Sequence, residues 1–163
     1  MKAKILLLLM FSLFSRCSSD RNIMPEGAIT GYEYVYSGTM AHPIRFYKVE
    51  RDSKGVLGLH FSEHDEKVTV YKVPEETLGF IDGIVREAKL HKLRTSYRPP
   101  VEVLDGYGWY VCISYEKGHI VSGGENASAP KAQREGIERI NQHLQDIIDS
   151  SSEADILSRY ERE

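Results

Sequence analysis

The chain has 163 residues, which fits one domain with short appendages and excludes two full-sized domains. Hydrophobic residues make up 41% of the chain and charged residues 28%, which excludes a disordered or membrane-embedded protein. The formal charge is −3, from 21 basic and 24 acidic residues. The basic residues are scattered, so no basic surface predicts a nucleic-acid partner. Two cysteines are too few for a disulfide scaffold.

The first residues have the pattern of an export signal, which we place over 1–17. Two lysines are followed by an apolar run over 5–14, which is too short to cross a bilayer core that needs about 20 helical residues. The run is followed by Cys17 and a polar stretch. This segment resembles a bacterial lipoprotein signal, in which the cysteine is acylated and becomes the new N-terminus. Arg16 stands where a small residue is usual, and an ordinary cleaved signal or an uncleaved anchor are the alternatives.

Cys17 is therefore predicted to carry acyl chains such as palmitate, which anchor the protein to a membrane. Removal of residues 1–17 leaves 18 basic and 24 acidic residues, a formal charge of −6. Such an acidic domain is not attracted to anionic lipid headgroups, so the lipid alone would hold it. We expect an outer-membrane lipoprotein of the cell envelope, on the periplasmic or the surface face. Cys112 would be the remaining thiol, so no intrachain disulfide is expected.

A single α+β domain is expected over 28–150, after a flexible tether over 18–27. Alternating apolar and polar residues, with turn signals between the runs, predict an antiparallel meander of four strands. These strands are expected at 29–37, 44–51, 56–62 and 68–73.

Two amphipathic helices and a hairpin complete the predicted domain. Pro74 and the acidic residues after it are typical of a helix start, and apolar residues then recur at helical spacing. A second helix is expected over 131–149, and 151–163 is expected to be a charged tail or a short helix. Further strands are expected at 101–104, 109–116 and 119–122. The order predicts an antiparallel sheet of about six strands, with both helices packed on one face.

Short motifs in the last third of the chain carry a resemblance. An Asp-Gly-x-x-Trp motif begins at Asp105, and a Ser-Gly-Gly-x-Asn-x-x-x-Pro motif spans 122–130 before the second helix. These motifs resemble the C-terminal part of small bacterial cell-envelope lipoproteins of the Bacteroides type. The resemblance implies the fold and the envelope location, and it implies no catalytic activity and no cofactor.

An anion site and a nucleophile each have a simpler structural explanation. The Gly-Gly pair at 123–124 can expose backbone amides to an anion, but Glu125 would repel it. A sharp bend into the following helix explains the glycines better. Cys112 could act as a nucleophile with His91 or His119 as its base. A cysteine inside a strand is more often a small buried hydrophobe, so we expect no catalytic residue there.

The segment 60–65 holds two histidines and two acids that could ligate a metal. On a helix, His60 and His64 would converge, but this region has the pattern of a strand and a turn, so we expect no metal site. Catalysis on a glycan would instead require two carboxylates in a cleft beside aromatic residues. The candidates are Glu33, Glu63, Asp65, Asp105 and Glu125.

Aromatic residues are the remaining candidates for ligand binding. Three tyrosines share one face of the first strand, and Tyr107 and Trp109 lie near a turn. Tyrosine and tryptophan suit sugars or peptides because each has an apolar body and a polar tip. Asn126 is the third candidate, although hydrogen bonding to local backbone also explains it. Cross-strand aromatic packing inside the sheet is the alternative for all of these aromatic residues, and it is the favoured one.

We therefore expect a membrane-anchored, non-catalytic binding or assembly module that needs no cofactor. Its expected partners are the membrane, through the lipid, and an envelope protein, peptide or glycan. An enzyme or inhibitor-like module that acts on envelope glycans or peptides is the alternative. A docking platform for a protein partner is a third hypothesis, and it would require a flat exposed apolar patch.

Overall fold

The structure is a computed structural model that describes residues 23–38, 44–64, 67–101, 103 and 106–162. Cys17 and the predicted signal lie outside the described residues, as do Asp65 and Asp105. Within the described part, eight strands, two α-helices and two short 3-10 helices are formed. No helix among these residues is long and apolar enough to cross a membrane.

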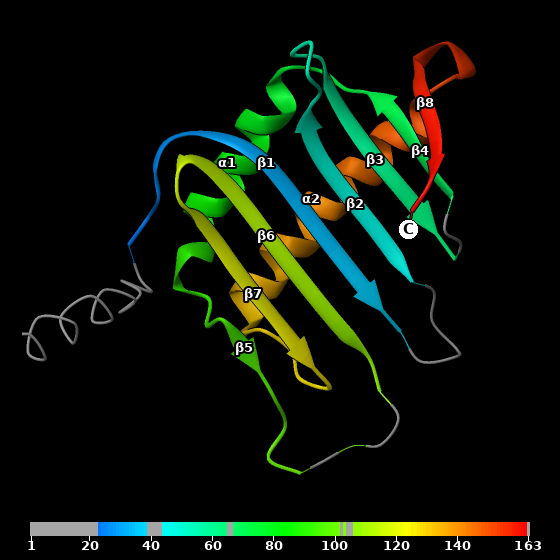
Figure 1. Cartoon of the computed structure of the whole chain (residues 1–163). Helices are drawn as coiled ribbons and strands as arrows, with labels where there is room; N and C mark the ends of the chain where they lie inside the picture. The colour runs from blue at the N-terminus through cyan, green and yellow to red at the C-terminus, as the bar shows by residue number, and fades with distance from the viewer. Residues whose placement is uncertain (1–22, 39–43, 65–66, 102, 104–105, 163) are drawn as a thin grey trace, which may run out of the picture.

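One mixed sheet contains all eight strands (Figure 1). The strands are β1 Glu26–Ser37, β2 Arg45–Arg51, β3 Leu57–Glu63, β4 Lys67–Lys72, β5 Ser96–Tyr97, β6 Gly108–Lys117, β7 His119–Glu125 and β8 Ile156–Glu161. Their order across the sheet is β5-β7-β6-β1-β2-β3-β4-β8, and every neighbouring pair is antiparallel except the parallel pair β5 and β7. The predicted α+β class and antiparallel sheet are confirmed, with eight strands rather than about six.

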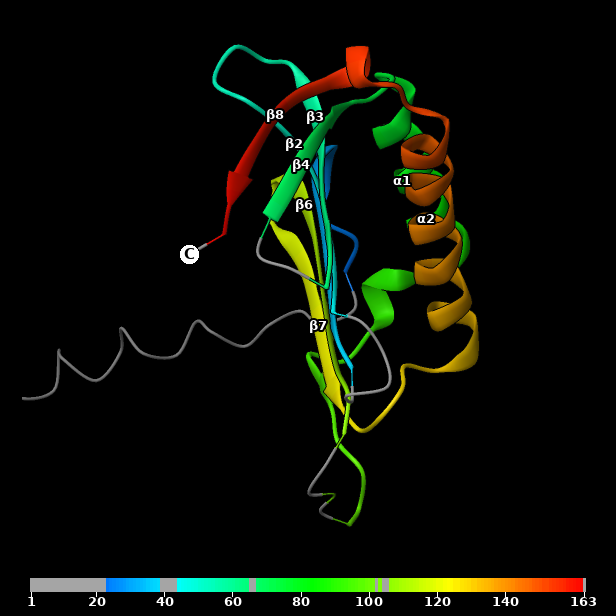
Figure 2. The ribbon, with the colours of Figure 1, turned by 90° about the vertical axis from the view of Figure 1, so that its right-hand side faces the viewer.

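Both α-helices lie on the same side of the sheet (Figure 2). They are α1 Glu76–Glu87 and α2 Lys131–Ser150, and the 3-10 helices are η1 Leu90–Lys92 and η2 Glu153–Asp155. Apolar residues recur on one face of each α-helix, and Ile81, Val85, Ile140 and Leu144 are wholly buried. Burial of this apolar face, rather than helix propensity, supplies most of the stability of such a helix.

The main core lies between the two helices and the helix-facing side of the sheet. On β6, Trp109, Val111 and Ile113 face the helices, while Tyr110 and Cys112 point to the opposite side. This is the alternation that the pleat of a strand imposes, and the sequence pattern predicts it.

The two unexpected strands lie at the edges of the sheet. The sequence predicts a charged tail or a short helix over 151–163, but Ile156–Glu161 pairs with β4 as β8. A capping box between Ser152 and Asp155 turns the chain through η2 into this strand. At the other edge β5 pairs with β7, and no strand forms at Val101 or Val103. These two side chains are 72% and 48% exposed, so no buried face stabilises a strand there.

β8 covers one edge of the helix-free side of the sheet, away from α1 and α2 (Figure 2). Beneath it lies a second apolar group, Phe46, Val68 and Val70, which is buried but separate from the main core. Tyr160 is opposite Val68 in the strand register, and the guanidinium of Arg162 lies 5.0 Å from the centre of the Phe46 ring.

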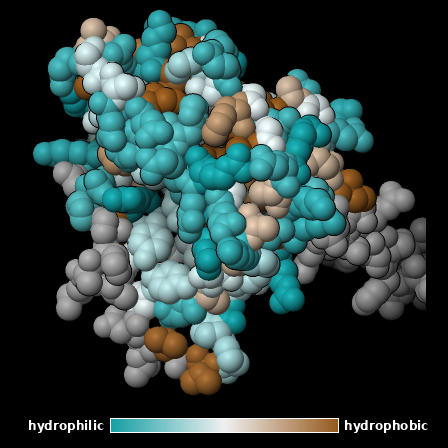
Figure 3. All heavy atoms as spheres, turned by 180° about the vertical axis from the view of Figure 1, so that it is seen from behind, coloured by the Kyte–Doolittle hydropathy of each residue, from teal (hydrophilic) through white to brown (hydrophobic). Residues whose placement is uncertain are grey.

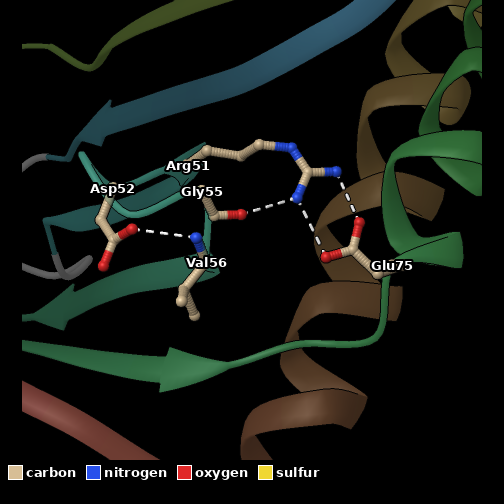
Figure 4. A network of polar contacts seen from close by, with 5 residues as sticks. All are labelled: Arg51, Asp52, Gly55, Val56 and Glu75. Carbon is tan, nitrogen blue, oxygen red and sulfur yellow. Dashed lines mark hydrogen bonds and ion pairs between the residues drawn. The ribbon is translucent and has the colours of Figure 1, made fainter.

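Arg51 connects the sheet to the start of α1 (Figure 4). Its Nη1 atom donates to the Gly55 carbonyl at 3.0 Å and to Oε1 of Glu75 at 2.9 Å. In the same turn, Oδ1 of Asp52 accepts the backbone N–H of Val56 at 2.9 Å. Because the Arg51 and Glu75 side chains are exposed, the ion pair fixes geometry more than it adds stability.

Candidate ligand-binding groove

A groove lies between α2 and the helix-facing side of β1, and two adjoining hollows of about 400 and 150 Å³ form it. Both hollows are lined by Tyr34, Tyr36 and Glu138, so they are parts of one feature. Figure 3 views this side of the molecule, where a largely hydrophilic surface gives way to paler side chains of intermediate hydropathy in its lower part. Its volume falls within the range of small-molecule sites, about 300–1,000 Å³.

The aromatic wall of the groove follows from strand register. Tyr36 of β1 is directly opposite Trp109 of β6, so both side chains project on the same side of the sheet. The ring of Tyr36 stacks on that of Tyr107, with ring centres 6.1 Å apart and planes at 26°. The Tyr97 ring lies against Trp109 at 5.9 Å. Tyr36, Tyr107 and Trp109 are each only half-buried, which leaves ring surface accessible.

Trp109 is fixed by the loop that follows β7. Its indole Nε1 donates a hydrogen bond to the Ala127 carbonyl at 2.7 Å. A Cβ atom on Gly124 would lie 2.4 Å from both this carbonyl oxygen and the indole nitrogen, so only glycine allows the approach. The backbone N–H of Gly123 donates to the Thr95 carbonyl at 3.1 Å. The Gly-Gly pair thus serves close packing, and one of its amides is already used by the fold.

Asn126 positions Tyr107 from the same loop. It adopts a left-handed conformation with φ of 51°, its Oδ1 accepts the Tyr107 N–H at 2.9 Å, and its own N–H donates to the Tyr107 carbonyl at 2.8 Å. A Cβ on Gly106 would collide with this amide at 1.4 Å. Of the three predicted ligand-binding residues, the structure brings Tyr107 and Trp109 into the groove and uses Asn126 to hold backbone.

The opposite wall carries amide side chains of α2. Tyr32 donates its hydroxyl proton to Oδ1 of Asn141 at 2.7 Å, and Tyr47 donates to Oε1 of Gln145 at 2.9 Å. These bonds fix the amide planes, and they turn the NH₂ group of Asn141 away from its tyrosine partner. Sequence reasoning missed these amides. Asn141 and Gln145 are four residues apart beside the apolar stripe of the second helix, and this spacing is the feature of the sequence that indicates a shared helix face.

The charged groups that line the groove are already paired. Arg45 donates through Nε to Oε1 of Glu63 at 2.8 Å, and Glu138 lies 3.6 Å from Nε of Arg134. Burial raises the pKa of Tyr34 to about 12, so its hydroxyl keeps its proton at neutral pH. The groove therefore presents aromatic rings, hydroxyls and amides without an unpaired charge among the described residues.

His60 and His64, for which the sequence pattern favours a strand and a turn over a metal site, lie away from the groove. His60 is on the helix-free side of β3, where its Nδ1 is 3.0 Å from the Tyr160 hydroxyl and its Nε2 is 3.6 Å from Glu50. His64 is in the following turn with φ of 66° and is exposed. In the described ranges, no three potential ligands cluster closely enough to hold a metal ion.

The candidate catalytic carboxylates that the structure describes do not converge. Glu33 faces the helix-free side, opposite Lys48 and Cys112 in the strand register. Glu63 pairs with an arginine of β2, and Glu125 lies 3.8 Å from Arg98. β3 and β7 are four strand spacings apart, which is about 19 Å.

Cys112 is half-buried on the helix-free side of β6, and its Sγ lies 4.0 Å from the Ser114 hydroxyl. Val121 is its register partner on β7, while His119 is opposite Ser114. His91 is in η1, next to Leu90, which is part of the core on the helix side. Neither predicted base is therefore a register neighbour of the thiol.

Comparisons with known proteins add no constraint on this site. No protein-family model matches the chain, and a search of curated proteins finds no match. The geometry of the groove is therefore the main evidence on function.

Proposed function

We propose that this protein is a non-catalytic binding module of the cell envelope, anchored by lipid on Cys17, whose ligand occupies the groove beside α2. The observation that carries the proposal is a hollow in which Tyr34 and Tyr36 face amide side chains of α2, adjoined by a smaller hollow lined by Tyr107 and Trp109. Aromatic and amide groups that converge on one concave surface are typical of a ligand site.

The burial of individual tyrosines separates core packing from ligand binding. Tyr32 and Tyr47 are each 2% exposed, and α2 amides satisfy their hydroxyls, so these two residues belong to the core. Tyr34 and Tyr36 follow on the same strand face but keep accessible surface, and no described residue hydrogen-bonds to their hydroxyls. Packing within the core therefore does not account for the hydroxyl groups of Tyr34 and Tyr36.

The position of the groove also suits a tethered binding protein. The predicted tether leads into β1 at Glu26, whereas Tyr34 and Tyr36 lie toward the other end of that strand. Ten residues of strand separate Glu26 from Tyr36, which is roughly 34 Å. An anchor before β1 would therefore be attached at the end of that strand that lies farther from these tyrosines.

Binding is favoured over glycan hydrolysis by the lining of the groove. A glycosidase needs two carboxyl groups about 5–10 Å apart. Glu138 is the one carboxylate among the described lining residues of the two hollows.

The experiment that tests the proposal has an anchor arm and a groove arm, both in cells that make the full chain. In the anchor arm, Cys17→Ala is expected to abolish lipid labelling and to release the protein from the membrane fraction. The matched control is Cys112→Ala, which removes the other cysteine and should leave both readouts unchanged. Unchanged membrane retention of the Cys17 variant would contradict the anchor.

In the groove arm, a photoreactive benzoylphenylalanine replaces Tyr36, or Tyr110 as the control. The two positions lie near each other on adjacent strands but on opposite sides of the sheet. Light is expected to produce a covalent adduct from position 36 and not from position 110. No adduct at position 36, or equal adducts at both positions, would contradict a ligand in the groove.

A further inference from the structure

We infer that the ligand of the groove is a neutral oligosaccharide, an inference that rests on the proposed function and specifies its ligand. Three features carry the inference: stacking surface on one wall, hydroxyl and amide groups that match sugar hydroxyls, and the pairing of every charged lining group described in the structure.

The stacking surface suits the faces of pyranose rings. Aromatic rings carry negative charge on their faces, which attracts the weakly positive C–H groups on one side of a sugar ring. Tyr36, Tyr107 and Trp109 are held by ring stacking and by the indole hydrogen bond to Ala127. They are therefore rigid before a ligand arrives, which lowers the entropy cost of binding.

The polar groups of the groove match adjacent sugar hydroxyls. Each sugar hydroxyl donates and accepts, so it needs both kinds of partner. The NH₂ group of Asn141 is not used by Tyr32, which occupies Oδ1 instead. The hydroxyls of Tyr34 and Tyr36 can donate or accept a hydrogen bond.

Charge favours a neutral ligand over an acidic or a basic one. Arg45 is paired with Glu63 and Glu138 with Arg134, so no charged group that lines the groove and is described in the structure lacks a partner. Both pairs are exposed and therefore weak, so this is a preference and not an exclusion. A neutral ligand leaves both pairs intact.

The dimensions fit a chain of sugars rather than one. On α2 the groove runs from Glu138 to Gln145, seven residues of helix and about 10 Å, enough for about two linked pyranose rings. The smaller hollow extends it toward Trp109. A proline-rich peptide would instead need an apolar floor along the whole groove, but the larger hollow is lined by amides and hydroxyls. Ala129 and Ile137 supply apolar lining in the smaller hollow.

The single tryptophan of the chain gives a direct readout, because Trp109 lines the groove. The full chain in detergent is titrated with cellohexaose, maltohexaose and chitohexaose, and with a proline-rich decapeptide and hexagalacturonic acid as non-matching probes. At least one neutral hexasaccharide is expected to change the indole fluorescence saturably. The peptide and the acidic sugar are expected to have no effect.

Matched variants locate the binding. Tyr36→Ala is expected to weaken saccharide binding about tenfold, whereas Tyr110→Ala, on the other side of the sheet, is expected to leave it unchanged. Asn141→Asp keeps the acceptor for Tyr32 and removes the NH₂ donor, so it should also weaken binding about tenfold. Thermal melts of each variant confirm that it remains folded.

The outcomes separate the ligand class from the proposed function. No saturable response to any neutral hexasaccharide, or a response that Tyr110→Ala abolishes and Tyr36→Ala does not, overturns the saccharide assignment. A photo-adduct at position 36 that protease removes would overturn it while leaving a groove ligand in place. The absence of that adduct would overturn both.

Discussion

One face of the sheet lies under α1 and α2, and on the other face β8 folds over one edge of the sheet. Tyr36 and Tyr110 allow a direct comparison of the two faces because they lie close together on adjacent strands. Tyr110 is opposite Val35, which precedes Tyr36 in β1. Each is an accessible tyrosine at the same level of the sheet. Tyr36 faces a second wall, which α2 supplies, whereas the hollow beside Tyr110 is lined by strands of the sheet and Thr95.

The comparison teaches that aromatic content alone does not make a binding site. The helix-free face has accessible aromatic residues, Tyr110 and Tyr160, and a hollow of about 350 Å³ beside Tyr110, but no described helix residue lines that hollow. The groove arises because α2 crosses the strands beside an aromatic strand face. Its amides are then held in place by tyrosines that belong to the core.

The largest expected effect is a loss of stability when the core under α1 and α2 is disrupted. Ile140→Ala removes a wholly buried side chain from the interface between α2 and the sheet, and it should lower the free energy of unfolding by about 2–5 kcal/mol. Cys112→Ala, on the helix-free face, should lower it by less than about 1 kcal/mol. Urea denaturation followed by circular dichroism checks both, and equal losses would contradict the assignment of the main core to one face.

A smaller effect on stability is expected at Asn126, in the loop that positions Tyr107 of the groove. Asn126→Ala removes the Oδ1 acceptor of the Tyr107 N–H and places alanine at a positive φ, which should cost about 1–2 kcal/mol. Saccharide binding should weaken while the fold is kept. Asn126→Asp retains the acceptor and should restore most of the binding, as fluorescence titration would show. Failure of this rescue would indicate that Asn126 does not act through Tyr107.

The alternation of apolar and polar residues along the strands made much of the fold predictable. The spacing of Trp109, Val111 and Ile113 assigns their faces correctly, because a strand allows only two side-chain directions. The two α-helices also follow from local signals. Pro74 indicates the start of α1, and the apolar stripe indicates that α2 is a helix. These features depend on residues that are close together in the sequence.

The remaining features depend on contacts between distant residues. β8 was missed because its charged residues, such as Arg159, are tolerated on an exposed edge strand and give no alternating pattern. The role of Asn141 depends on its contact with Tyr32, 109 positions away in the sequence. Two of the three predicted ligand residues do line the groove, but the four-residue spacing of the α2 amides does not by itself show which strand they face.

The most direct test of the central claim, that the ligand binds on the helix side, uses fluorine nuclear magnetic resonance of the protein labelled with fluorotyrosine. The chain has ten tyrosines, on both faces of the sheet, and single Tyr→Phe variants assign their signals. On addition of the neutral hexasaccharide that gives the strongest fluorescence response, Tyr34, Tyr36 and Tyr107 are expected to shift. Tyr110 and Tyr160 should not. Shifts confined to Tyr110 and Tyr160, or spread equally over both faces, would contradict the account.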